Sequence, residues 1–180
     1  CARCCYTREL YSLECSMSVL SVHEKLQRLT DRQHAKLTQL AEQVIQRSSK
    51  AQRQDSYKNA LVELNKSFEQ YFAEAATIAF GLHPAQAKKI RYKKDRIKTF
   101  KQHGLDYQNI DGAETAQILS LIAQAIVYED ATVTADLDNT FPFWKEGYPM
   151  VQFDNTYSIL AEDINLHFQQ VLQELGNYLQ

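Results

Sequence analysis

Residues 156–179 carry apolar side chains at the spacing of one face of an α-helix. These side chains are Tyr157, Leu160, Ile164, Phe168, Val171, Leu175 and Tyr178. On a helix, residues three, four and seven positions apart share a face, so the stripe predicts an amphipathic helix that buries one side. The 180 residues include only five glycines and three prolines, which argues against a turn-rich β-sandwich or β-barrel. Together these features predict an all-α protein.

Four other segments show a helical pattern. The period recurs at 19–47, 56–80 and 113–129, and the last of these is apolar on nearly every side, so we expect it to be the central helix. A further helix should begin at Pro84, which suits a first helical position, and end at Gly104, a good C-terminal cap. Asp111 is the predicted N-cap of the helix that follows. We therefore expect a bundle of about five helices.

Residues 130–155 form the only long stretch without a helical period. They predict one irregular loop or short hairpin insertion, with ATVTA and PMVQF as its two candidate strands. The insertion contains four large aromatic residues, Phe141, Phe143, Trp144 and Tyr148. These side chains either fill a gap between helices or form a surface that binds a protein partner.

All four cysteines, Cys1, Cys4, Cys5 and Cys15, lie within the first fifteen residues. This crowded cluster lacks the two separated pairs that structural zinc prefers, and it has no nearby histidine. From Met17 onward the chain has an ordinary helical pattern. We therefore expect residues 1–16 to be an N-terminal extension that is non-native or disordered, and residues 17–180 to be a single helical domain. A metal or redox role for the cysteines, and a lipid anchor on Cys1, are the alternatives.

Positive charge is concentrated between Lys88 and Lys101. Eight of these fourteen residues are Lys or Arg, and Asp95 is the only acid among them. From Met17 to Gly104 the chain has seventeen basic and eight acidic residues, whereas from Leu105 to Gln180 it has twelve acidic residues and a single base. The predicted polyanion-binding residues, taken to lie on one basic helix over 88–101, are Lys88, Lys89, Arg91, Lys93, Lys94, Arg96, Lys98 and Lys101.

Three interpretations of this charge are open. The bases could bind a polyanion, most simply nucleic acid, because phosphates reward a dense row of cations through counterion release. Six of the eight are Lys, which suits phosphate contact better than bidentate base reading. They could instead meet an acidic protein, or be neutralised within the fold by acids of the second half, namely Glu129, Asp130, Asp136, Asp138, Glu162 and Asp163. They could also form a solvated face, although like charges four positions apart repel.

The segment RIKTFKQH, from Arg96 to His103, resembles the Arg–His motif of HEPN-type ribonucleases, which are helical bundles. The resemblance covers about residues 55–180. It implies that Arg96 stabilises a phosphate and that His103 transfers a proton where two subunits meet and RNA is cleaved. The motif allows four to six residues between the Arg and the His, and Arg28 and His34, with five between them, fit it as well.

Other catalytic motifs are missing from the sequence. It contains no glycine-rich phosphate loop, no Gly-x-Ser-x-Gly and no His-Glu-x-x-His. The sequence therefore favours a non-enzymatic interaction protein that binds nucleic acid or an acidic protein, with a homodimer as one arrangement. We expect no cofactor, no metal and a cytoplasmic location, and no stretch is apolar for long enough to predict a membrane span.

Overall fold

The computed structural model describes the backbone of residues 6–46 and 49–180, and the side chains of residues 22–44, 46 and 49–180. Within these residues the protein is all-α, as predicted, with six helices and no β-strand. The helices are α1 (Tyr6–Ile45), α2 (Lys50–Phe80), α3 (Pro84–Lys89), α4 (Lys93–Gln102), α5 (Ala113–Tyr128) and α6 (Phe153–Tyr178). Two 3₁₀ helices, η1 (Tyr107–Asn109) and η2 (Ala135–Leu137), lie in the connections. None of the described helices is both long enough and apolar enough to cross a membrane.

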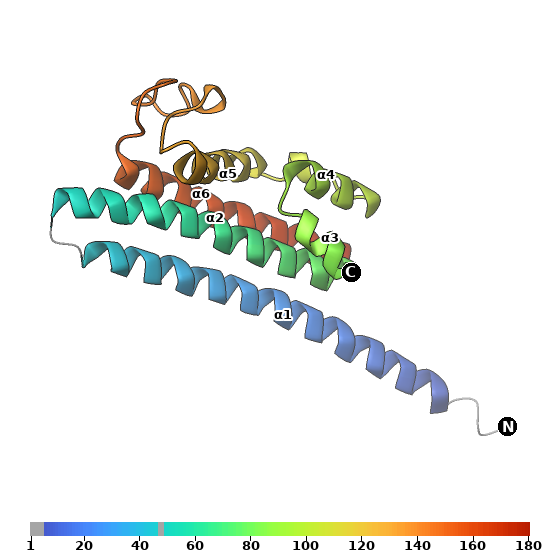
Figure 1. Ribbon diagram of the computed structural model, residues 1–180. Coiled ribbons are helices and arrows are strands. Elements are labelled where there is room, and N and C mark those ends of the chain that lie inside the picture. The colour runs from blue at the N-terminus through green and yellow to red at the C-terminus, as the bar shows by residue number, and fades with distance from the viewer. Residues whose placement is uncertain (1–5, 47–48) are drawn as a thin grey trace.

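The three long helices α1, α2 and α6 run side by side, and α5 packs against α2 and α6 (Figure 1). The central helix is α2, which contacts α1, α3, α5 and α6. The expectation that the helix near 113–129 is central was therefore wrong. Although α5 is the most apolar helix, its C-terminal turn exposes Val127 and Tyr128 to solvent. The broad buried stripe of α2 lets it take neighbours on several sides, and this places it in the middle.

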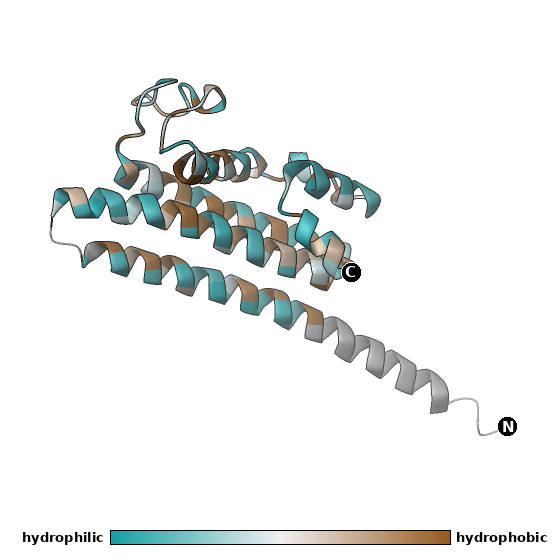
Figure 2. Cartoon of the chain, viewed as in Figure 1, coloured by the Kyte–Doolittle hydropathy of each residue, from teal (hydrophilic) through white to brown (hydrophobic). Residues whose placement is uncertain are grey.

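Aromatic side chains fill the core around α2. Phe68 meets Phe168 of α6 edge-on, with ring centroids 6.3 Å apart, and Phe72 stacks on Phe100 of α4 at 5.6 Å. Each of these four rings is at most 2% exposed. Burying a side chain of this kind contributes about 1.5–3 kcal/mol, so the rings fix α4 and α6 against α2. Figure 2 shows apolar positions, in brown, recurring along α2 and dominating α5.

Local capping determines where several helices begin and end. α2 begins at Lys50, earlier than the predicted residue 56, because the Ser49 hydroxyl accepts a hydrogen bond from the Gln52 N–H at 3.1 Å. Pro84 is the first residue of α3, as predicted. Gly104, with φ of 76°, follows α4 in the left-handed conformation, and the Leu105 N–H donates to the Phe100 carbonyl at 3.0 Å. The predicted role of Gly104 in ending the helix is thus confirmed.

Residues 84–104 form two helices rather than the predicted single helix. α3 ends at Lys89 and α4 begins at Lys93, and Tyr92 between them is extended. The Arg96 side chain explains the break, because its Nε donates to the Ile90 carbonyl at 3.2 Å and its Nη2 to the Arg91 carbonyl at 3.0 Å. In a continuous helix these two carbonyls would accept from backbone N–H groups four residues on. The predicted basic helix over 88–101 is therefore divided between α3, the break and α4.

Gly112, not the predicted Asp111, is the N-cap residue of α5. Gly112 has φ of 80°, and no side chain caps this helix. A Cβ atom on Gly112 would lie 2.7 Å from the Cβ of His167, which is too close for any other residue to fit without movement. The backbone carbonyl of Asp111 lies 2.6 Å from His167 Nδ1. The close approach of α6 to the start of α5 therefore decides which residue stands there.

Residues 130–152 form the predicted irregular insertion, which ends three residues earlier than predicted because α6 begins at Phe153 rather than at residue 156. Thr132 and Pro149 make one isolated antiparallel bridge, and the two candidate strands do not form. Trp144 is 1% exposed, and its Nε1 donates to the Val151 carbonyl at 2.9 Å. Its ring meets Phe141 edge-on, with centroids 4.9 Å apart. Phe141 and Trp144 thus pack the inside of the insertion.

The predicted N-terminal extension lies only partly within the described residues. Residues 1–5, with Cys1, Cys4 and Cys5, are outside them, and so is the Cys15 side chain. The backbone of residues 6–16 belongs to α1. The predictions that residues 1–16 are non-native or disordered, and that the cysteines have a metal, redox or lipid role, stay predictions.

Candidate polyanion-binding segment

Seven of the eight predicted bases are exposed on α3, on α4 and on the residues between them. The term basic segment is used below for these seven residues: Lys88, Lys89, Arg91, Lys93, Lys94, Lys98 and Lys101. Arg91 also contacts Tyr92, donating from Nη2 to the phenol oxygen at 2.9 Å, and its guanidinium lies 4.9 Å from the ring centre. The six lysines carry their charge on flexible stems that reach solvent.

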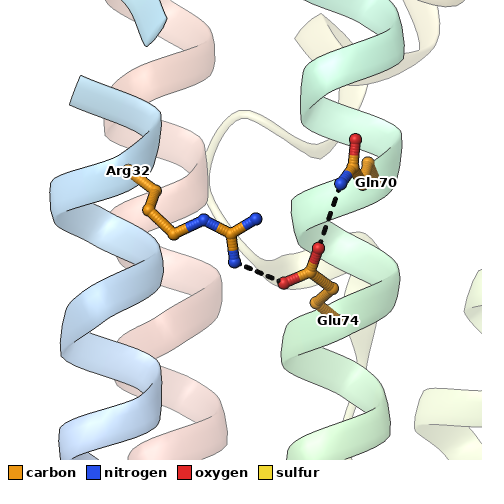
Figure 3. Close-up of polar contacts among 3 residues, drawn as sticks. All are labelled: Arg32, Gln70 and Glu74. Atoms are coloured by element: carbon orange, nitrogen blue, oxygen red, sulfur yellow. Dashed lines mark hydrogen bonds and ion pairs between the residues drawn. The ribbon is translucent and has the colours of Figure 1, made fainter. Parts of the chain in front are cut away.

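The ion pairs of the described residues lie elsewhere. Arg32 of α1 donates from Nη1 to Oε2 of Glu74 on α2 at 2.8 Å, and Gln70 donates to the other oxygen of Glu74 (Figure 3). Two more pairs join neighbours one turn apart within α2. Across the described part of the chain, no base of the basic segment has a carboxylate oxygen within 4.0 Å.

The six acidic residues considered above for internal neutralisation form no ion pair with the basic segment. Glu129, Asp130, Asp136 and Asp138 follow α5, whereas the basic segment precedes it, so that the two groups lie near opposite ends of this helix (Figure 1). A helix of 16 residues is about 24 Å long, and salt screens exposed charges over about 8 Å. Glu162 and Asp163 are exposed on α6 and pair with none of these bases. The positive charge is left for solvent or a partner.

Arg96 is the one predicted polyanion contact that the structure places in the core. It is 4% exposed. Its guanidinium lies 4.4 Å from the ring centre of Phe72 and 5.1 Å from that of Tyr107. Because Arg96 also binds the carbonyls of Ile90 and Arg91, it holds the α3–α4 break together and is not part of the exposed charge. Counting bases along the sequence could not separate Arg96 from its neighbours.

A buried hydrogen-bonded chain runs from Arg96 to the start of α5. Arg96 Nη1 donates to the Tyr107 oxygen at 2.9 Å, this oxygen lies 2.9 Å from His167 Nε2, and His167 Nδ1 lies 2.6 Å from the Asp111 carbonyl. A carbonyl can only accept, so Nδ1 carries the His167 proton and Nε2 accepts from the Tyr107 hydroxyl. Each hydrogen bond from Arg96 to the Asp111 carbonyl therefore has one assigned donor and one assigned acceptor.

Burial keeps the two middle members of this chain uncharged. It lowers the pKa of His167 to about 4, with the positive charge of Arg96 acting in the same direction and the Asp111 carbonyl opposing. Burial likewise raises the pKa of Tyr107, against the opposing effect of Arg96. Sequence analysis missed both residues. The available signal for His167 was its position on the inward stripe of α6, beside Phe168.

His103 and Arg96 contact different sets of residues. Its ring stacks on Phe80 with centroids 4.0 Å apart, and its Nδ1 lies 3.1 Å from the Tyr178 hydroxyl. α4 ends at Gln102, so His103 does not continue the helix on which Arg96 stands. In the contacts of the described residues, the pair implied by the HEPN resemblance is not brought to a common site.

Three of the four predicted partner-binding residues are buried or half-buried within the insertion. Phe141 and Trp144 are buried and Phe143 is half-buried, and Phe143 stacks on Phe141 at 5.4 Å. Only Tyr148 of the four predicted contact residues is exposed, at 68%. The side chains that were candidates for binding a partner thus mainly stabilise the insertion itself.

A function for this protein is therefore inferred from the exposed basic segment and from the buried hydrogen bonds between Arg96, Tyr107, His167 and Asp111. Comparison of the chain with protein-family models, with curated proteins and with solved structures found no match.

Proposed function

We propose that this protein binds a polyanion, most simply nucleic acid, through the basic segment. The observation that carries the proposal is the exposure of all seven bases together with the lack of a carboxylate partner for any of them among the described residues. Like charges at this density repel one another. A row of phosphates would offset the repulsion and would release condensed counterions on binding.

The start of α4 adds a second argument. Lys93 and Lys94 are the first two residues of this helix, where the helix dipole disfavours positive charge. Acidic residues at these positions would stabilise α4, so the lysines oppose the local preference. Breaks of local preference are expected at functional or strained sites, and contact with phosphate would offset the unfavourable position of these lysines.

The composition of the segment favours contact with the phosphate backbone over reading of bases. Six of the seven residues are Lys, and the guanidinium of Arg91 is already bonded to Tyr92. Lysine presents a point charge, whereas bidentate recognition of a base edge needs a free planar fork. We therefore expect DNA and RNA of equal length to bind with similar affinity and little sequence preference.

A salt titration of binding tests the proposal. Fluorescence anisotropy with labelled single-stranded RNA and duplex DNA should give a logarithm of affinity that falls linearly with the logarithm of salt concentration. The double variant Lys93→Glu/Lys94→Glu should bind at least about tenfold more weakly, and its salt slope should be shallower by about 2.

The matched control is Lys25→Glu/Lys50→Glu, which makes the same change in net charge at two exposed residues outside the segment. It should bind almost as the parent protein does. An equal loss in the control, or no binding of either nucleic acid at low salt, would rule out the basic segment as a nucleic-acid site. Polyglutamate serves as the probe for the alternative partner, an acidic protein. That partner, a homodimer and a cytoplasmic location stay predictions.

A further inference from the structure

A small cavity lies beside Arg96, between α2, the start of α4 and α5. Its volume is about 150 Å³. Since about 10–15 Å³ is enough to hold one water molecule, the cavity has room for an anion with four oxygens. Its polar lining includes Asn65 and Glu69 from α2, Arg91, Lys93 and Arg96 from the α3–α4 region, and Ser120 from α5. Arg91 and Lys93 are also exposed, so the cavity adjoins the basic segment.

Arg96 brings a buried positive charge to this cavity without a carboxylate to balance it. Its five N–H groups include three that donate to Ile90, Arg91 and Tyr107, which leaves two. Buried charges in proteins are normally paired, because an unpaired charge in a low-dielectric interior is costly. With Arg91 and Lys93, the lining holds three cations against the single carboxylate of Glu69.

The start of α4 adds donors on the same side. Tyr92 and Lys93 line the cavity, and Tyr92, the N-cap residue, makes no side-chain hydrogen bond to the helix. The first N–H groups of a helix have no partner within the helix, and they attract anions together with the helix dipole. The cavity therefore combines an uncapped helix start with three cationic side chains.

Asn65 supplies the independent observation that a ligand belongs here. It is 8% exposed and lines the cavity, and its Oδ1 is buried without a hydrogen-bond partner. Its Nδ2 donates to Glu69 Oε1 at 3.2 Å. The Glu69 carboxylate can only accept, so this bond fixes which Asn65 atom is the oxygen. The unpaired Oδ1 needs a donor, and a ligand that suits the whole cavity must have both anionic oxygens and a hydrogen to give.

We infer that this cavity binds a single phosphate group that retains a proton, either free phosphate or the end of a phosphate monoester. The phosphate oxygens accept from Arg91, Lys93, Arg96 and the start of α4, and its hydroxyl donates to Asn65 Oδ1. The inference does not depend on the proposed function, since a free phosphate needs no nucleic acid. A phosphodiester inside a nucleic-acid strand has no proton to donate and fits the site poorly.

Titration with inorganic phosphate at constant ionic strength tests the inference. Calorimetry should show saturable binding of one phosphate, and the backbone amide signals of Lys93, Lys94 and Ser120 should move in NMR spectra. Sulfate has the same shape but no proton at neutral pH, so it should bind about tenfold more weakly, as expected for the loss of one hydrogen bond to a buried acceptor. Absence of saturable phosphate binding, or equal binding of sulfate, would overturn the inference.

Two variants with a matched control locate the site. Ser120→Asp places a carboxylate in the cavity and should abolish phosphate binding, while its unfolding transition verifies that it is folded. Lys93→Ala should weaken phosphate binding by about tenfold. Lys98→Ala removes an exposed base of the same helix that does not line the cavity, and it should leave phosphate binding unchanged. Equal weakening by Lys93→Ala and Lys98→Ala would mean that phosphate binds only to surface charge and would also overturn the inference.

Competition experiments separate the two sources of phosphate. At about pH 6 roughly half of a phosphate monoester still retains a proton. At this pH, displacement of inorganic phosphate by glycerol phosphate would assign the site to monoesters, and failure to displace it would assign the site to free phosphate. Dimethyl phosphate, which has no proton to donate, should not compete, and competition by it would contradict the role of Asn65. If the protein binds phosphate but no nucleic acid, this inference stands and the proposed function is wrong. If it binds nucleic acid but no phosphate, the proposed function stands and this inference is wrong.

Discussion

Arg96 is held by carbonyl groups, a phenol and aromatic ring faces rather than by a carboxylate. A desolvated guanidinium over an aromatic face gains about 2 kcal/mol, and Arg96 lies within 5.4 Å of the centres of three rings, those of Phe68, Phe72 and Tyr107. This surrounding is why one of eight similar bases in the sequence became a core residue. The sequence alone gave no means of choosing it, because the choice depends on Tyr107 and on the break at Ile90.

His167 should make the stability of the protein depend on pH. Its pKa is about 4 in the folded protein, compared with 6.5 for an unperturbed histidine. Between these values the unfolded chain binds more protons than the folded chain does, so the free energy of unfolding falls as the pH drops. We expect a loss of about 2 kcal/mol between pH 7 and pH 5.

The variant His167→Gln, whose amide can still donate to the Asp111 carbonyl, should lack this part of the pH dependence. Urea unfolding of both proteins at the two pH values measures it. If the two proteins lose the same free energy of unfolding on acidification, His167 is not the group responsible.

Gly112 should tolerate substitution poorly, because α6 approaches it closely. Gly112→Ala combines a positive φ of 80° with a Cβ placed 2.7 Å from the His167 Cβ, and it should lower the free energy of unfolding by about 2–4 kcal/mol. Gly147 has the same φ and no atom within 4 Å of an added Cβ, so Gly147→Ala should cost only about 1 kcal/mol. Urea unfolding compares the two variants. Equal losses would show that contact with His167 adds nothing to the backbone strain.

Among the elements, helices with a continuous apolar stripe were predictable and the α3–α4 region was not. In α6 the predicted residues Tyr157, Leu160, Ile164, Phe168, Val171 and Leu175 are all buried, and only Tyr178 at the end is exposed. A long stripe determines its own helix because burial of one face exceeds any local preference. In 84–104 the apolar residues are few, so a single buried side chain, that of Arg96, could decide the path of the backbone.

Reversal of charge at the start of α4 should stabilise the helix while it weakens binding. Lys93→Glu/Lys94→Glu puts acidic residues in the first turn, where each should contribute about 0.3–1 kcal/mol at low salt. Lys98→Glu/Lys101→Glu makes the same charge change in the second half of α4, where the dipole favours cations, and it should give no such gain. Urea unfolding at low and high salt measures both. A Lys93→Glu/Lys94→Glu protein that is less stable than the parent would contradict the predicted effect of the helix dipole. Its weaker binding of nucleic acid could then result from misfolding.

On the scale of the whole molecule, charge is separated along α5. The basic segment lies before this helix and Glu129, Asp130, Asp136 and Asp138 lie after it. The sequence shows how many basic and acidic residues each half contains. The distance between the basic segment and the acidic residues depends on how the helices pack. Only the fold could therefore distinguish internal charge pairing from an exposed basic surface. A field with this polarity would orient an approaching polyanion toward α3 and α4 before contact.

Trp144 is the only tryptophan of the chain, and it is buried in the insertion that follows α5. The indole chromophore therefore lies in the segment that follows the C-terminal end of α5, whereas the lysines of α4 precede its N-terminal end. Its fluorescence emission should therefore report local unfolding of the insertion, and it should change little when a ligand binds at α3 and α4.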